Sequence, residues 1–399
     1  MRIERIELRL LRLPLVRFFE TSFGRIHERP FVLVTVEEAG SAGVGECVAD
    51  ANPFYSAETT ATAWHIISEF VAPIVLGREF AHPREIFDAL AVIRGHNMAK
   101  AAVEMAAWDM YARQQGHPLA GVLGGSPAII ESGIASGVSI GIQDSLDELA
   151  ERVDVERRTG YRRIKIKIKP GWDIDAVAMI RERFGDIPLM VDANAAYHLA
   201  DAAHLSRLDP FGLMMIEQPL DYDDIRDHAA LQRQIRTPIC LDESLHAVRA
   251  AAEAIEIGAC RIINIKPGRV GGHGQSIRLH DLAAAHGIPV WHGGMLESGI
   301  GRAHNIHLST LANFRLPGDV AASRRYYAPD LIDPEIDVRP DGTIAVPTGP
   351  GIGVTIDWNR VAAATEARLE TRMNTDHGST PTTDDHGSTR KAEPPKART

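Results

Sequence analysis

Five charged residues end five short apolar runs in the middle of the chain, at nearly equal intervals. They are Lys167, Asp192, Glu217, Asp242 and Lys266, spaced 25, 25, 25 and 24 residues apart. Three carboxylates that converge on one place repel one another unless a cation lies among them. Ligands that are all oxygen favour Mg²⁺ over Zn²⁺, with Mn²⁺ as the second choice. The pattern therefore predicts that Asp192, Glu217 and Asp242 bind Mg²⁺; the alternative is a structural cluster neutralised by Lys and Arg.

The two lysines that flank the carboxylates are candidate acid/base groups. A lysine serves as a base only if its pKa falls towards neutral pH, and burial or a neighbouring cation lowers that pKa. Lys165 would crowd Lys167, and Arg269 lies three residues after Lys266. This set suits removal of a proton next to a carboxylate, with the metal stabilising the enediolate that forms. Bases on opposite faces of that intermediate predict racemisation or epimerisation.

The regular spacing also predicts the elements that must position these residues. An interval of this length fits a strand, a loop and a helix that returns to the next parallel strand. In a (β/α) barrel the strand ends of one polarity open at one face, where active sites lie. Side chains alternate along a strand, so Lys165 and Lys167 would face the barrel axis and Ile164 and Ile166 the surrounding helices. Further strands are predicted at residues 136–140 and 288–292, with an abbreviated eighth at 316–319.

The chain outside the repeat predicts a second domain. Residues 3–13 and 31–37 have the pattern of strands and 57–113 that of helices, which is an α+β arrangement. Residues 14–24 are expected to form a loop whose three phenylalanines pack into a core or close over a ligand. We therefore predict the following domains: an α+β capping domain over 1–128, to which 342–358 returns, a (β/α)₇β barrel over 129–330, and a disordered tail over 371–399.

Composition excludes several other classes of protein. The formal net charge is −10 and no basic block stands out, which argues against a nucleic-acid surface. No apolar run approaches the roughly 18 residues of a membrane span. Cys47, Cys240 and Cys260 form neither a disulfide framework nor a zinc pattern. The first residues alternate in charge and do not resemble a signal peptide. We expect a cytoplasmic protein that acts on a small molecule.

The motifs around the five charged ends resemble those of a known family. They are Lys-Ile-Lys-Ile-Lys-Pro-Gly-Trp-Asp (165–173), Val-Asp-Ala-Asn (191–194), Ile-Glu-Gln-Pro-Leu (216–220), Cys-Leu-Asp-Glu-Ser (240–244) and Asn-Ile-Lys-Pro-Gly-Arg-Val-Gly-Gly (264–272). The sequence resembles the muconate-lactonising subgroup of the enolase superfamily over residues 1–357. Within that subgroup it is most similar to N-succinylamino acid racemases that also act as o-succinylbenzoate synthases.

The resemblance implies an α/β fold, with a modified (β/α)₇β TIM-type barrel under an α+β N-terminal cap. It implies that Asp192, Glu217 and Asp242 are the Mg²⁺ ligands and that Lys167 and Lys266 are the acid/base pair. Arg269 is expected to modulate the site. The residues expected to contact the substrate are Lys165, which would hold its carboxylate, Asn194 beside the metal site, Phe19 and Phe23 in the covering loop, and Ser139, Gly294 and Met295 along the acyl arm.

The function that this resemblance implies is racemisation of N-acylamino acids, N-succinylamino acids above all, by two-lysine 1,1-proton transfer. The alternative on the same site is o-succinylbenzoate synthase, a syn dehydration in menaquinone biosynthesis, alone or as a second activity. A dipeptide epimerase, a cycloisomerase and a non-catalytic scaffold are further alternatives. Phe18 and Glu20 depart from the family pattern in the covering loop and leave the preferred side chain open. The expected assembly is a homo-oligomer.

Overall fold

A four-stranded antiparallel sheet begins the fold. The computed structural model describes residues 1–373. The strands of this sheet, in spatial order, are β15 (Thr365–Arg372), β1 (Arg5–Thr21), β2 (Gly24–Glu38) and β3 (Ser41–Cys47). Together with the helices α1 (Thr60–Ile66), α2 (Ala72–Val75), α3 (Arg84–Ala89) and α4 (Asn97–Gln114), the sheet forms the cap.

Helix α4 packs closely against this sheet. Val32, Val34 and Val36 alternate along β2 and are fully buried in a core that the α4 side chains share. Gly43 and Gly45 of β3 make the approach possible, because a Cβ atom at either position would lie 2.1 Å from a backbone carbonyl oxygen of α4. The cap therefore has a hydrophobic core of its own.

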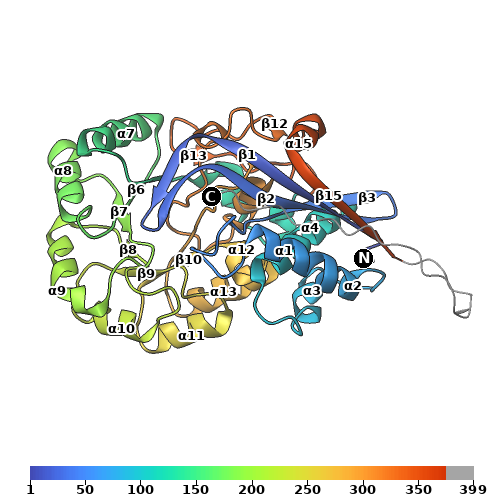
Figure 1. Ribbon diagram of the computed structural model, residues 1–399, viewed down its shortest axis with the longest axis horizontal. Coiled ribbons are helices and arrows are strands. Elements are labelled where there is room, and N and C mark those ends of the chain that lie inside the picture. Colours follow the sequence, from blue (N-terminus) through green and yellow to red (C-terminus); the bar gives the residue numbers. More distant parts are fainter. Residues whose placement is uncertain (374–399) are drawn as a thin grey trace, which may run out of the picture.

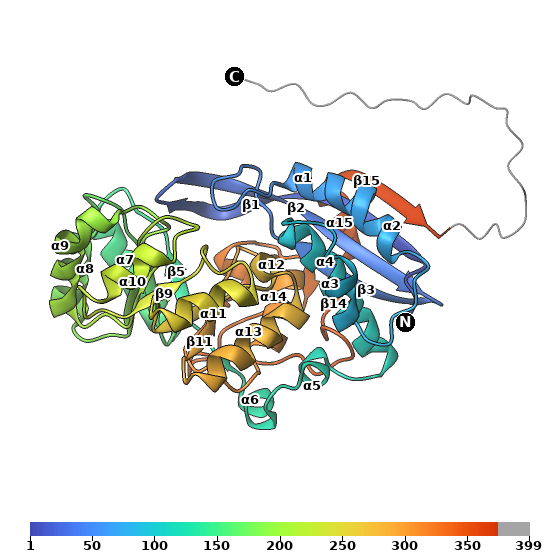
Figure 2. The ribbon, with the colours of Figure 1, turned by 90° about the horizontal axis from the view of Figure 1, so that it is seen from below.

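The β1–β2 hairpin reaches from the cap over the barrel (Figures 1 and 2). Residues 14–24, which were predicted to form a loop, instead carry β1 on to Thr21 and turn into β2 at Gly24. The ladder between the two strands is interrupted only between Pro14 and Phe19. Proline has no N–H to give to a ladder, so the break in the sequence pattern marks an irregularity inside a longer strand.

Seven parallel strands form the barrel sheet, and the sequence predicted each of them. They are β5 (Val138–Ile140), β6 (Ile164–Lys167), β7 (Leu189–Asp192), β8 (Ile216–Glu217), β9 (Ile239–Leu241), β10 (Ile262–Ile265) and β11 (Val290–His292). The helices α7 (Leu146–Thr159), α8 (Ile174–Phe184), α9 (Ala202–Leu205), α10 (Arg226–Gln232), α11 (Val248–Glu256), α12 (Pro267–Val270), α13 (His273–Ala285) and α14 (Gly299–Leu308) alternate with them. No helix among residues 1–373 is long and apolar enough to cross a membrane.

The predicted eighth strand is present only as isolated bridges. Phe314 bridges to Val290 of β11, and Gly318 bridges to Ser136, just before β5. The Asp319 N–H also donates to the His292 carbonyl at 2.7 Å. This segment therefore links the two edges of the parallel sheet, and the proline inside it (Pro317) prevents a continuous ladder.

The interior of the barrel is layered along its axis. An apolar cluster contains Met190, Met215, Cys240, Ile262 and Trp291 from four strands and the β8 segment. The charged strand ends lie two residues further along β7 and β8, on the same parity. The predicted alternation on β6 is confirmed, because its isoleucines are buried in the main core. The carboxyl end of the barrel therefore presents charges above an apolar floor.

The segment 342–358, which was predicted to return to the cap, has contacts with both parts of the protein. Its strands β13 (Thr343–Ile344) and β14 (Thr355–Ile356) pair with β4 (Ile134–Ala135) and β12 (Ile332–Asp333). Between them, Gly351 bridges to Pro118 and the Ile352 N–H donates to Asp109 Oδ1 of α4 at 2.7 Å. After α15 (Trp358–Ala364), the strand β15 joins β1. Thr371 and Arg372, placed in the predicted tail, belong to β15. The rest of that predicted tail, 374–399, lies outside the described residues.

Candidate active site

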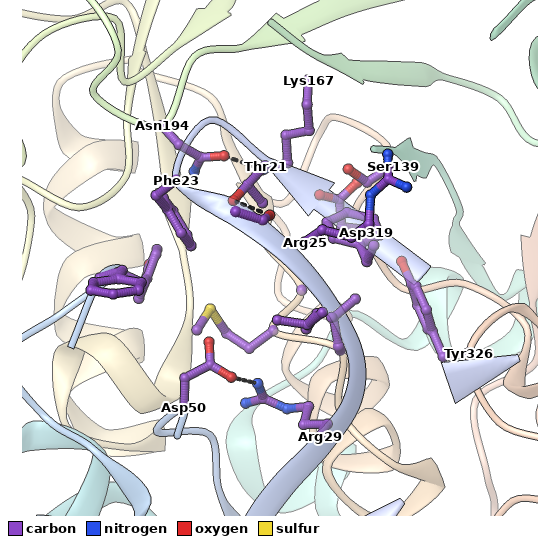
Figure 3. Close-up of a pocket in the computed structure, with 18 of the residues that line it drawn as sticks. Thr21, Phe23, Arg25, Arg29, Asp50, Ser139, Lys167, Asn194, Asp319 and Tyr326 are labelled. Carbon is purple, nitrogen blue, oxygen red and sulfur yellow. Dashed lines mark hydrogen bonds and ion pairs between the residues drawn. The ribbon is translucent and has the colours of Figure 1, made fainter. Parts of the chain in front are cut away.

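A cavity of about 920 Å³, including the space open to solvent at its mouth, lies between the barrel and the cap. Figure 3 shows side chains from both parts pointing into it. Of the predicted site residues, those that line it are Lys165, Lys167, Lys266, Asn194, Ser139, Phe19, Phe23, Gly294 and Met295. Asp192, Glu217 and Asp242 are almost fully buried and contact these lysines, and Arg269, also buried, pairs with Asp242; none of the four lines the cavity. The structure thus brings all the predicted residues to one place.

Each predicted metal ligand is engaged by a cationic side chain. Asp192 and Glu217 are register partners at the ends of β7 and β8. Lys165 Nζ lies 2.9 Å from Glu217 Oε2 and 3.2 Å from Asp192 Oδ2. Asp242 pairs with Lys266 at 2.6 Å and with Arg269. Across residues 1–373, no three acidic, histidine or cysteine side chains form a ready-made metal site in this arrangement.

The donor set nevertheless fits a divalent cation of the Mg²⁺ type. Asp192, Glu217 and Asp242 follow three consecutive strands, and all their donor atoms are oxygen. Burial of three carboxylates is costly unless positive charge compensates them. Here the compensation comes from Lys165, Lys167, Lys266 and Arg269, which pair with the three carboxylates.

Lys167 is held at the end of β6 by two acceptors. Its Nζ donates to Asp192 Oδ2 at 2.6 Å and to Asn194 Oδ1 at 2.7 Å. The Asn194 amide in turn donates to Glu243 Oε1 at 2.9 Å. Asn194 has a left-handed backbone, with φ of 42°, and its N–H donates to Asp192 Oδ1. A strained residue with every polar group engaged is typical of a functional site.

Lys266, at the end of β10, has a different pair of partners. Its Nζ donates to Asp242 Oδ2 at 2.6 Å and to the Tyr55 hydroxyl at 3.1 Å. The Tyr55 hydroxyl donates to Asp242 Oδ1 at 3.0 Å, so it bridges the lysine and the carboxylate. Tyr55 comes from the cap, in the loop that follows β3. One of the two candidate bases is therefore completed by a residue outside the barrel.

The electrostatic environment treats the two lysines differently. Burial lowers the pKa of Lys167, as the sequence predicted. Burial would also lower the pKa of Lys266, but Tyr55 and Glu217 raise it above the ordinary value, so the expected fall is not found there. Burial and the neighbouring Asp192 raise the pKa of Glu217. Burial would raise the pKa of Asp192 too, but the Lys167 ammonium group helps to hold it well below its usual range.

The hairpin tip covers the cavity and is fastened to the barrel loops. The Ser22 hydroxyl donates to the Asn194 carbonyl at 3.0 Å, and the Ile142 N–H donates to the Glu20 carbonyl at 3.0 Å. Glu20 also pairs with Lys169 at 3.3 Å. Phe19 is buried and packs edge-to-face on Tyr326, with ring centroids 6.4 Å apart.

Several residues that line the cavity, and the buried Glu243 behind it, were not found from the sequence. Asp319, which pairs with Lys165 at 2.5 Å, ends the segment 316–319 that was predicted as the abbreviated eighth strand, so its place at a strand end could have pointed to it. Glu243 stands beside Asp242 in a motif already noted. Tyr55 lies in a segment without periodicity, so no signal points to it. The buried Arg29–Asp50 pair lies, in Figure 3, at the end of the drawn residues opposite Lys167 and Asn194.

Curated relatives match this chain over nearly its whole described length. An o-succinylbenzoate synthase of Geobacillus kaustophilus is 52% identical over 365 residues, which cover 91% of this chain and 96% of the relative. An N-succinylamino acid racemase of Thermus thermophilus is 49% identical over 354 residues, 89% of this chain and 95% of that protein. Enzymes named for a racemase activity and for a lyase activity are thus similar to this chain to almost the same degree.

Solved structures share the fold. An enolase-superfamily member from Listeria innocua has a TM-score of 0.89 at 40% identity, covering 94% of this chain and all of that one. A dipeptide epimerase from Cytophaga hutchinsonii, solved in complex with Mg and the dipeptide D-Ala-L-Val, has a TM-score of 0.84 at 25% identity, covering 93% and 100%. Two domain descriptions match: "Mandelate racemase / muconate lactonizing enzyme, N-terminal domain" over residues 5–124 and "Enolase C-terminal domain-like" over 147–360. The chain therefore belongs to the mandelate racemase/muconate lactonizing enzyme family of the enolase superfamily.

Proposed function

We propose that this protein racemises N-acylamino acids, N-succinylamino acids above all, by a two-lysine 1,1-proton transfer in which one lysine removes the α-proton and the other supplies a different proton. The observation that carries the proposal is the placement of Lys167 and Lys266. They line one cavity from β6 and β10, with three strands between them. When two such groups approach a bound α-carbon from different sides, one can remove the α-proton from one face and the other, as its ammonium form, can deliver a proton to the opposite face.

A divalent cation, Mg²⁺ first, would be held by Asp192, Glu217 and Asp242. Members of the superfamily generally use Mg²⁺, and the oxygen-only donor set at three adjacent strand ends supports the same choice. When bound, the cation would stabilise negative charge on the substrate carboxylate while the α-proton leaves. Lys165 would hold that carboxylate from the side of β6, since its ammonium group lines the cavity.

The residues around the lysines would orient the substrate and exclude water. Phe19 and Met295 are buried apolar side chains on opposite parts of the protein, the hairpin and the barrel loop after β11, and both line the cavity. Ser139 and Gly294 line it beside them, and we assign the acyl arm to this side. A dry, closed site strengthens every electrostatic contact made inside it.

Replacement of Lys266 by Arg tests the two-lysine chemistry. Arginine keeps the charge but is effectively never deprotonated, so Lys266→Arg should stop racemisation of both enantiomers of an N-succinylamino acid. Lys167 should still exchange the α-hydrogen of one enantiomer with deuterated solvent, measured by proton NMR. Racemisation by this variant near the parent rate would show that Lys266 is not the second base.

o-Succinylbenzoate synthesis is the second candidate function, and the 52%-identical synthase favours it. A syn dehydration needs one group to remove the proton and then protonate the leaving hydroxyl on the same face. Lys167 would take both roles, and Lys266 would act mainly as a positive charge. Lys266→Arg should therefore impair dehydration less than racemisation. Assay of both substrates on the parent protein decides whether it has one activity or both.

The remaining alternatives are less well supported. A non-catalytic scaffold disagrees with the enzyme activities for which the close relatives are named. Dipeptide epimerases and cycloisomerases match at lower identity, 25% and 28% in the examples compared. The cytoplasmic location and the homo-oligomeric state stay predictions from the sequence; light scattering of the purified protein tests the second.

A further inference from the structure

Each candidate base is oriented by a separate neutral partner, one from the barrel and one from the cap. We propose that Glu243, acting through Asn194, aims Lys167, and that Tyr55 aims Lys266, so that the two proton transfers can be impaired independently. The inference rests on the proposed racemase function and goes beyond it by naming two positioning residues. Neither of them was among the residues expected from the sequence.

The ammonium group of each lysine is held in one orientation by two hydrogen bonds. A lysine Nζ carries three N–H donors in a tetrahedral arrangement. Lys167 gives one to Asp192 and one to Asn194; Lys266 gives one to Asp242 and one to Tyr55. Within residues 1–373, neither lysine has a third partner. Two fixed acceptors stop rotation about the Cε–Nζ bond, so the third position, which carries the reacting proton or the lone pair, has a set direction.

Glu243 fixes the acceptor used by Lys167. Lysine only donates, and the Glu243 oxygen only accepts from the amide. The Asn194 side chain must therefore turn its oxygen to Lys167 and its nitrogen to Glu243, as observed at 2.7 Å and 2.9 Å. Glu243 is 7% exposed, and its second oxygen has no hydrogen-bond partner in the described part of the chain. Burying a carboxyl group with one partner is costly, which points to a role for that single contact.

Tyr55, a residue of the cap, is itself the neutral acceptor that orients Lys266. Its hydroxyl accepts from Lys266 while it donates to Asp242, so both the donor and the acceptor capacity of the phenol are used. The lysine Nζ also lies 4.5 Å from the centroid of the Tyr55 ring. Tyr55 is 8% exposed. An amide and a phenol carry no charge, so each lysine can keep its neutral partner both before and after it transfers a proton.

The inference predicts opposite defects from two conservative substitutions. Exchange of the α-hydrogen with deuterated solvent is measured separately on each enantiomer of an N-succinylamino acid, and Lys266→Arg identifies the enantiomer that Lys167 serves. Tyr55→Phe, which keeps the ring, should slow exchange of the enantiomer served by Lys266 by at least about tenfold and change the other by less than about twofold. Glu243→Leu should produce the reverse pattern.

Glu243→Gln is the matched control for charge. It removes the charge but keeps an oxygen that accepts from Asn194, so its exchange rates should stay within about threefold of the parent. In Glu243→Leu, by contrast, the exchange rate of the enantiomer served by Lys167 should fall. If the exchange rate falls as far in Glu243→Gln as in Glu243→Leu, the charge of Glu243 and not its orientation of Asn194 is responsible, and the positioning role of Glu243 is overturned. If Glu243→Leu does not fold, Glu243→Ala is measured in its place.

The ratio of the two exchange rates separates orientation from general damage. A partly unfolded or poorly closed variant slows both enantiomers equally and leaves the ratio unchanged, so an unchanged ratio in Tyr55→Phe overturns its positioning role. The parent protein tests the underlying function in the same experiment. If the parent exchanges neither enantiomer, the proposed racemase function fails; if it exchanges both and the variants leave the ratio unchanged, only the present inference fails.

Discussion

The barrel mouth and the cap form opposite walls of one cavity and are built in different ways. The barrel contributes side chains from strand ends at fixed intervals, and the three carboxylates Asp192, Glu217 and Asp242 are at most 1% exposed. The cap contributes a hairpin tip and a loop, where Phe23 is 38% and Phe54 63% exposed. The buried, regular wall carries the lysines and carboxylates proposed for the chemistry, and the irregular wall carries aromatic rings, Tyr55 and the Arg29–Asp50 ion pair. Changes in the first should abolish turnover, and changes in the second, apart from Tyr55 beside Lys266, should mainly weaken binding.

Removal of divalent cations should have the largest effect, because it acts on the barrel wall. Exhaustive chelation should abolish racemisation, and added Mg²⁺ or Mn²⁺ should restore it, since Asp192, Glu217 and Asp242 would hold the cation. Glu217→Gln should also be inactive while its circular dichroism spectrum stays that of the parent. Full turnover after chelation would contradict the assignment of the three carboxylates.

Phe19→Ala should have an intermediate effect, on binding. Phe19 is a buried cap residue that lines the cavity. Its ring represents about 1.5–3 kcal/mol of apolar burial, so KM should rise about tenfold to a hundredfold, with a smaller change in kcat and none in metal affinity. Phe23→Ala is the matched control on the same hairpin, with a smaller rise because Phe23 is more exposed. An equal loss of substrate and metal binding would indicate a folding defect in the cap.

The smallest effect should come from the ion pairs that fasten the hairpin tip. Glu20 pairs with Arg25 at 2.7 Å and with Lys169 at 3.3 Å. Partly exposed pairs contribute about 0.2–1 kcal/mol, so Glu20→Gln should raise KM up to about fivefold, and high salt should have a similar effect on the parent. Glu28→Gln, on the same hairpin but outside the cavity, should leave KM unchanged. A fall of kcat in Glu20→Gln would contradict the expectation that these hairpin ion pairs affect substrate binding and not turnover.

The same division explains what the sequence could predict. The strands, their order and the residues Lys167, Asp192, Glu217, Asp242 and Lys266 all follow from one repeated pattern, because parallel strands bring equivalent positions to one edge. The repeat could not reveal that three carboxylates would be neutralised by neighbouring cationic side chains. That result depends on side-chain conformations, which no spacing encodes.

The cap was harder to predict because its contacts are long-range and aperiodic. Tyr55 reaches Lys266 across 211 positions of the chain, and Ser22 reaches the Asn194 carbonyl across 172. Pro14 led to the prediction of a loop where the strand resumes after an irregularity. Such contacts depend on how the cap packs on the barrel, which a local sequence pattern does not predict.

The pairing of β15 with β1 has a consequence for the order in which the chain is made. Arg5 pairs with Arg372 and Ile6 with Thr371, so the first strand to leave the ribosome finds its outer neighbour only after the whole barrel has been synthesised. Until then β1 presents an open edge, which can template pairing with another polypeptide. A nascent chain that stalls before Thr365 would keep that edge exposed, so β15 protects the completed fold against edge-to-edge aggregation.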